Sequence, residues 1–170
     1  MTSLVLTVIG PDKPGLVEQL SHTIVAHEGN WLESGLSRLG GKFAGIVLVD
    51  LPEVQVSSLQ AALQALQSSG LKVSSEVSED QTREVSLKPI TLDLIGHDKP
   101  GIVRDISQAL AARQINVEHL DTSLVSGSMS AELLFKAEAQ LLAPESLDID
   151  ELQTALESIA SDLMVDISIN

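Results

Sequence analysis

Residues 4–15 read LVLTVIGPDKPG, and residues 90–101 read ITLDLIGHDKPG. Both segments begin with apolar residues at every second position and end on the same tetrapeptide, DKPG. The match continues without a gap at an offset of 86 residues, so that 14 of 46 positions are identical between residues 4–49 and 90–135. Repetition over this length indicates a duplicated domain, and two copies are too few for a solenoid.

The duplication sets the expected domain boundaries. We expect one domain at residues 1–82 and a second at residues 86–170, with the polar segment 78–85 as the linker. At 170 residues the chain is long enough for two small domains. Its hydrophobic content of 44% is sufficient for a buried core in each.

Each copy shows the same succession of patterns. Period-two alternation predicts a strand, helical spacing after DKPG predicts a helix, and a Gly-containing turn between two further strands predicts a hairpin. A second helical pattern and a last strand complete the copy. The order βαββαβ is that of the ferredoxin-like fold. The expected fold class is therefore α+β, with two tandem domains that each have an antiparallel four-stranded sheet and both helices on one face.

Some finer features follow from the same patterns. Asp12 and Asp98 are candidate caps of the first helix of each copy, and Ser57 or Ser58 of the second helix in the first copy. In the second copy we expect a strand at residues 129–137, followed by a longer connection at residues 138–150. Such a connection is either functional or simply tolerated.

The composition excludes several classes of function. The net charge is −14, divided as −5 and −9 between residues 1–85 and 86–170, and only 2% of residues are aromatic. Direct nucleic-acid binding is therefore not expected. The chain has no cysteine, which excludes disulfides and thiol catalysis and fits a reducing cytoplasm. No signal peptide or long apolar segment is recognisable, so no membrane contact is expected.

The repeated G-x-D-K-P-G loop is the segment whose residues could bind a ligand. It joins a strand to a helix N-terminus, where backbone N–H groups and the helix dipole attract a carboxylate. Its Asp can accept an ammonium group, so the loop matches both charged groups of an amino acid. A tight turn without a ligand is the alternative, and both interpretations stay open at this point.

Two asparagines and one tryptophan extend the set of candidates. Asn30 and Asn116 each begin the second strand of a copy. We expect that strand to neighbour the first, which would bring the Asn near the DKPG loop; a turn residue after the helix is the alternative. Trp31 is the sole tryptophan and is interpreted as an interface anchor, with core packing or partial exposure as the alternative.

No catalytic constellation is recognisable. The sequence lacks a G-x-S-x-G elbow, a Walker A loop and a G-x-G-x-x-G motif. The four histidines lack the i, i+4 spacing of helical metal ligands. We therefore expect no catalytic residue, no metal site and no cofactor.

The βαββαβ order, with DKPG opening the first helix and an Asn fifteen residues later, resembles the ACT domain family. The resemblance covers nearly the whole chain, once per copy. It implies an amino-acid site lined by the loop and the following Asn, often at an interface between ACT domains. The residues implied are Asp12, Lys13, Pro14, Gly15, Leu16 and Asn30 in the first copy, and Asp98, Lys99, Pro100, Gly101, Ile102 and Asn116 in the second.

Two ACT domains without a catalytic or DNA-binding part resemble the family of glycine cleavage system transcriptional repressors. This resemblance implies a cytoplasmic, non-enzymatic regulator that responds to glycine or a similar amino acid. It also implies a protein partner, a LysR-type activator, in place of DNA, and leaves a homodimer open. A ligand-independent protein-binding adaptor is the alternative. A ferredoxin-like acylphosphatase would need an Arg at the loop, where both copies carry Lys.

Overall fold

The computed structural model of the chain describes residues 1–79, 86–127 and 131–170. The chain divides into two compact units, Met1–Gln81 and Thr82–Asn170, called unit 1 and unit 2 here. Most of the expected linker, residues 80–85, lies outside the described residues. Within the described part, no helix is long and apolar enough to cross a membrane.

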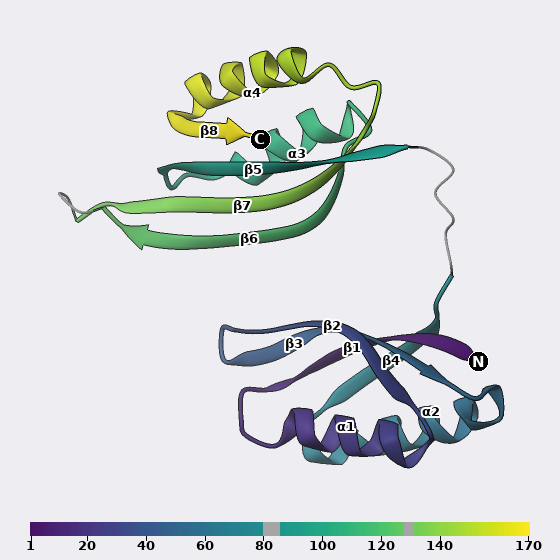
Figure 1. Cartoon of the computed structure of the whole chain (residues 1–170). Coiled ribbons are helices and arrows are strands. Elements are labelled where there is room, and N and C mark those ends of the chain that lie inside the picture. The colour runs from purple at the N-terminus through teal and green to yellow at the C-terminus, as the bar shows by residue number, and fades with distance from the viewer. Residues whose placement is uncertain (80–85, 128–130) are drawn as a thin grey trace. The chain divides into compact units, whose positions relative to one another are not determined.

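Unit 1 has the expected βαββαβ order, with both helices on one face of the sheet (Figure 1). Two short 3₁₀ turns, Glu53–Gln55 and Leu66–Ser69, flank the second helix. The main elements are β1 (Thr2–Pro11), α1 (Leu16–Ala26), β2 (Asn30–Leu39), β3 (Lys42–Leu51), α2 (Val56–Ala65) and β4 (Lys72–Val77).

Unit 2 repeats this architecture, which confirms the α+β, ferredoxin-like prediction for both copies. Its helices again cover one face of the sheet (Figure 1). The elements are β5 (Leu87–His97), α3 (Ile102–Ala111), β6 (Asn116–Ser126), β7 (Leu133–Pro144), α4 (Ile149–Leu163) and β8 (Val165–Ile169).

Both sheets are antiparallel and have equivalent strand orders. The order is β2-β3-β1-β4 in unit 1 and β6-β7-β5-β8 in unit 2. The first strand of each unit is therefore central, and the second strand lies at an edge. Because β1 and β2 both pair antiparallel with β3, they run in the same direction. The carboxyl ends of β1 and β2 consequently lie at one end of the sheet, together with the DKPG loop.

The core of each unit lies between the sheet and its two helices. On β1, Leu4, Leu6 and Val8 are buried, as the period-two pattern requires. The facing helix α1 buries Leu16, Leu20 and Ile24, which recur every four residues. No polar or charged residue is buried in the described part of the chain. The unit 2 core is built in the same way from Ile90, Leu92, Leu94, Ile102, Ile106, Leu110, Leu141, Leu152 and Leu156, among others.

The ungapped repeat ends at the β-hairpin of each unit. Leu39 pairs with Lys42 across the unit 1 hairpin, whereas its counterpart Val125 pairs with Leu134. Between these paired residues unit 1 has two residues and unit 2 has eight, so the offset between β3 and β7 is 92 residues. Continuing the ungapped match past this turn was therefore wrong.

The expected strand at residues 129–137 is confirmed over residues 133–137, whereas residues 129–130 lie outside the described residues. The expected connection at residues 138–150 is wrong. Strand β7 spans Leu133–Pro144, which leaves four residues before α4 begins at Ile149. Residues 138–143 continue the strand, with Ala139, Leu141 and Ala143 buried. Alanines on the buried face give a weak apolar pattern, so the alternation was missed.

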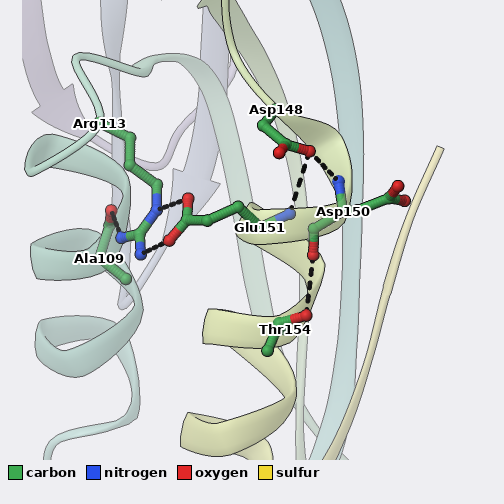
Figure 2. Close-up of polar contacts among 6 residues, drawn as sticks. All are labelled: Ala109, Arg113, Asp148, Asp150, Glu151 and Thr154. Carbon is green, nitrogen blue, oxygen red and sulfur yellow. Dashed lines mark hydrogen bonds and ion pairs between the residues drawn. The ribbon is translucent and has the colours of Figure 1, made fainter.

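The second helices begin differently in the two units. In unit 1 the short turn Glu53–Gln55 precedes α2 and its N-cap is Gln55, so neither Ser57 nor Ser58 is the cap. In unit 2 the carboxylate of Asp148 accepts hydrogen bonds from the backbone N–H groups of Asp150 and Glu151, at 3.0 and 3.3 Å (Figure 2). This is side-chain capping of the first turn of α4.

Candidate ligand site

Each DKPG loop follows the central strand and leads directly into a helix. The N-caps of α1 and α3 are Gly15 and Gly101, with φ of 94° and 98°. This left-handed conformation favours glycine, which explains the last residue of the motif. Asp12 and Asp98 stand three residues before these glycines, so the expectation that they cap the helices is wrong.

The unit 1 loop borders an open surface hollow of about 570 Å³. Its lining comes from three elements: the loop and the first turn of α1, the end of β2, and the start of β3. Arg38 of β2 lies close to the loop, with Nη1 3.5 Å from Oδ2 of Asp12. The lining residues are Asp12, Lys13, Pro14, Gly15, Leu16, Val17, Glu18, Arg38 and Phe43.

The lining of this hollow carries side-chain charges of both signs, the carboxylate of Glu18 among them. Asp12 supplies a carboxylate, while Lys13 and Arg38 supply cations beside the N-terminus of α1. The Arg38–Asp12 pair is solvent-exposed, with side-chain exposures of 73% and 38%, so the attraction between the two groups is weak. A ligand with one positive and one negative group can contact Asp12 and Arg38 in place of their contact with each other.

The unit 2 loop makes contacts within its own unit. Lys99 donates from Nζ to the carbonyl oxygen of Asp162 near the end of α4, at 3.3 Å. His97 lies with Nδ1 3.2 Å from Oε2 of Glu132. The guanidinium of Arg104 lies beside Gly101, 3.0 Å from the point where a Cβ would stand. The two loops thus share a sequence but differ in their surroundings.

The two asparagines do not lie near the loop of their own unit. The second strand of unit 1, β2, pairs with β3 and not with β1, and β6 of unit 2 pairs with β7 and not with β5. The expectation that the second strand neighbours the first strand was therefore wrong. Asn30 pairs with Asp50, which pairs with Ser3 near the start of β1, whereas the loop follows Pro11. At about 3.3 Å per residue, eight residues of strand separate the Asn from the loop by roughly 26 Å.

Asn116 occupies the equivalent position in unit 2. It pairs with Leu142, and its amide Nδ2 donates to Oε1 of Glu118 at 2.8 Å. The structure therefore brings the four DKPG residues of each unit together with the first helical residue, and it separates both asparagines from them.

Arg38 and Phe43 are lining residues that sequence reasoning missed. They lie 23 or more residues beyond the loop, and neither belongs to a motif. They reach the hollow because β2 ends, and β3 begins, beside the end of β1, where Pro11 pairs with Lys42. Only the strand order of the ferredoxin-like fold could have indicated them.

The family comparison agrees with this architecture. The model of the ACT domain matches residues 2–76 and again residues 88–170. The chain belongs to the ACT domain family. Each unit is one ACT domain, so the resemblance given by DKPG and the strand order is confirmed, and the tandem arrangement spans nearly the whole chain.

Two solved structures resemble the tandem ACT chain over almost its full length. A protein of unknown function from Galdieria sulphuraria is 28% identical, with a TM-score of 0.83 over 99% of this chain and 97% of its own. A second protein is 19% identical, with a TM-score of 0.69 over 99% and 96% of the two chains. That protein is described as a "putative glycine cleavage system transcriptional repressor"; at this identity the likeness shows the fold alone.

A curated relative matches a shorter stretch. UPF0237 protein MK1213 of Methanopyrus kandleri is 42% identical over 57 residues. The match covers 34% of this chain and 63% of the relative, less than two thirds of its length. The matched stretch is shorter than either of the two units of this chain.

Proposed function

We propose that this tandem ACT protein is a non-catalytic regulator that binds an amino acid at the DKPG loop and acts on a protein partner. The observation that carries the proposal is the hollow at the unit 1 loop, where Asp12, Lys13 and Arg38 line one surface. An α-amino acid carries a carboxylate and an ammonium on neighbouring atoms, and this lining offers an opposite charge to each. Charge-assisted hydrogen bonds of this type are the stronger ones in proteins.

Glycine is the first ligand to test. The tandem ACT architecture resembles that of a protein described as a glycine cleavage system repressor, which supports glycine or a similar amino acid as the signal. The chain's charge of −14 argues against contact with DNA, so the regulated partner is a protein. We propose a cytoplasmic transcription factor of glycine metabolism, of the LysR type, as that partner.

The asparagines can contact the ligand only if two ACT domains bind the same molecule between them. Asn30 lies roughly 26 Å from the loop of its own unit by strand length, too far to touch the same small molecule. A second copy of the chain could supply the Asn, and the ligand would then promote a homodimer. Sedimentation velocity with and without glycine tests this point, and Asn30→Ala should lower both affinity and dimerisation.

Calorimetric titration of the full chain with glycine, serine, alanine and glutamate tests the ligand proposal. We expect saturable binding of one or more of these, weakened at least about tenfold in Asp12→Ala, because a charge-assisted hydrogen bond is lost. Absence of binding for the whole panel would contradict the proposal. Unchanged affinity in Asp12→Ala would contradict the site.

A ligand-independent adaptor is the second candidate. It is favoured by the face of the unit 1 sheet opposite α1 and α2, where Ile9 and Ile46 are 44% and 58% exposed. Exposed apolar residues of this kind are typical of protein contacts when they cluster. Capture of the proposed transcription factor in equal amount with and without saturating glycine would favour the adaptor; glycine-dependent capture would favour the regulator.

A further inference from the structure

The two DKPG loops differ in what lies over their last glycine. At Gly15, no atom lies within 4 Å of the point where a Cβ would stand, so the backbone of the unit 1 loop is open to a ligand. At Gly101, the Arg104 guanidinium occupies the equivalent space, with a nitrogen 3.0 Å from that point. Arg104 also lies beside Asp105, with Nε 3.0 Å from Oδ1.

The second difference is the residue that the edge strand presents to the loop. Arg38 pairs with Phe43 on the neighbouring strand, and Leu124 pairs with Phe135 in the equivalent register. The cation that approaches Asp12 in unit 1 is therefore replaced by an aliphatic side chain in unit 2. A leucine cannot hold a carboxylate.

The third difference is the loop lysine. Lys13 lines the open hollow of unit 1. Lys99 instead donates to the carbonyl oxygen of Asp162, which joins the unit 2 loop to the end of α4. That hydrogen bond is at 3.3 Å and would have to break before Lys99 could serve a ligand.

We infer that only the unit 1 loop binds the amino acid, and that Arg38 binds its carboxylate. This inference rests on the proposed function and specifies it. The ligand lies in the hollow with its carboxylate on Arg38 and its ammonium on Asp12, replacing their mutual contact at 3.5 Å. Gly101 of the unit 2 loop has the left-handed conformation that starts α3, so this glycine is needed without a ligand. Each chain therefore binds one ligand.

Titration calorimetry with glycine and serine on the full chain measures the stoichiometry and the role of Arg38. We expect one ligand per chain in the wild type. Arg38→Leu, which gives unit 1 the residue of unit 2, should weaken binding at least about tenfold through loss of a charge-assisted hydrogen bond. Lys136→Leu is the matched control, because it removes an exposed cation from a sheet strand of unit 2 that does not line the unit 1 hollow, and the affinity of this variant should stay within about twofold of the wild type.

Amide NMR of the same protein locates the ligand. The Gly15 resonance should shift on titration while the Gly101 resonance stays in place. Two ligands per chain, a Gly101 shift as large as that of Gly15, or wild-type affinity in Arg38→Leu would overturn this inference and leave amino-acid binding itself intact. Absence of any heat and any shift with glycine, serine, alanine and glutamate alike would contradict the proposed function as well, so the two failures are distinguishable.

Discussion

Arg113, in the turn that follows α3, and Glu151 of α4 form a two-point ion pair that links the end of α3 to the start of α4 (Figure 2). Nε of Arg113 donates to Oε2 at 2.8 Å, and Nη2 donates to Oε1 at 2.6 Å. Nη1 of the same guanidinium donates to the carbonyl oxygen of Ala109. Unit 1 has His27 at the position that corresponds to Arg113, so this arginine contact is a property of unit 2.

The pair should make the stability of unit 2 depend on pH. The hydrogen bonds from Arg113 lower the pKa of Glu151, and those to Glu151 raise the pKa of Arg113. A carboxyl whose folded pKa is depressed stabilises the fold above its unfolded pKa of about 4.3, and the contribution is lost as the pH falls through the folded pKa. The contribution of Arg113 to stability persists up to the pKa of arginine in the unfolded chain, which lies above the pH range used for unfolding measurements.

We therefore expect Glu151→Gln to be less stable than the wild type at pH 7, and the difference to shrink towards pH 3. Urea unfolding followed by circular dichroism at both pH values measures it. Glu157→Gln removes another carboxylate from the same helix and serves as the control, with a smaller effect. A difference for Glu151→Gln that is equal at pH 7 and pH 3 would refute the role of the ion pair.

The α4 cap predicts a second stability effect. Asp148→Ala removes the acceptor for two backbone N–H groups, so it should cost about 1 kcal/mol of unfolding free energy. Ser57→Ala is the contrasting variant, because Ser57 lies inside α2 and is not its cap, and it should be neutral within about 0.5 kcal/mol. Urea titration of both variants checks the contrast; equal losses would show that Asp148 does not act as a cap.

Gly96 should tolerate no side chain. A Cβ there would stand 2.3 Å from Cγ1 and 2.7 Å from Cα of Val165, so β5 and β8 would have to separate. Gly96→Ala should therefore cost about 1–3 kcal/mol. At the equivalent Gly10 the nearest atoms are side-chain carbons of Leu71 and Leu16 at 3.1 and 3.2 Å, which can move. The unfolding free energy of Gly10→Ala should fall less; the reverse order would contradict the packing argument.

Trp31 packs against the core of unit 1, whereas Val117 stands at the equivalent register in unit 2. The smaller residue there borders an apolar groove of about 50 Å³ between α3 and the sheet. Trp31→Val should create a similar groove in unit 1 and cost about 1–3 kcal/mol.

Circular dichroism in urea is the measurement for Trp31→Val, since the variant has no tryptophan left. Leu39→Ala, at a site 82% exposed on the same strand, should change the unfolding free energy by less than about 0.5 kcal/mol. A loss for Trp31→Val no larger than that of Leu39→Ala would mean that Trp31 is not part of the core.

Local patterns sufficed for most of the fold. The alternation around Leu4 and Ile90, and the four-residue spacing of Leu16, Leu20 and Ile24, predict buried faces that the structure confirms. These patterns failed at the hairpin of unit 2, which has an insertion relative to unit 1. The sequences of the two copies still match at a few positions beyond the insertion, although the insertion shifts which residues of β7 pair with β6. They also failed at the caps, where Asp12 precedes the helix by more than the cap position allows.

Sequence patterns alone indicate that the chain is a duplicated ACT domain, and they indicate where its helices and most of its strands lie. They also show that both copies carry DKPG, with a glycine at the start of a helix. Periodicity and turn chemistry are local, so they can be read along the chain. Only the tertiary structure decided that Asn30 lies at the far end of the sheet from the loop and that Arg38 lies beside Asp12. Strand order sets both distances, and it depends on pairing between residues far apart in the chain.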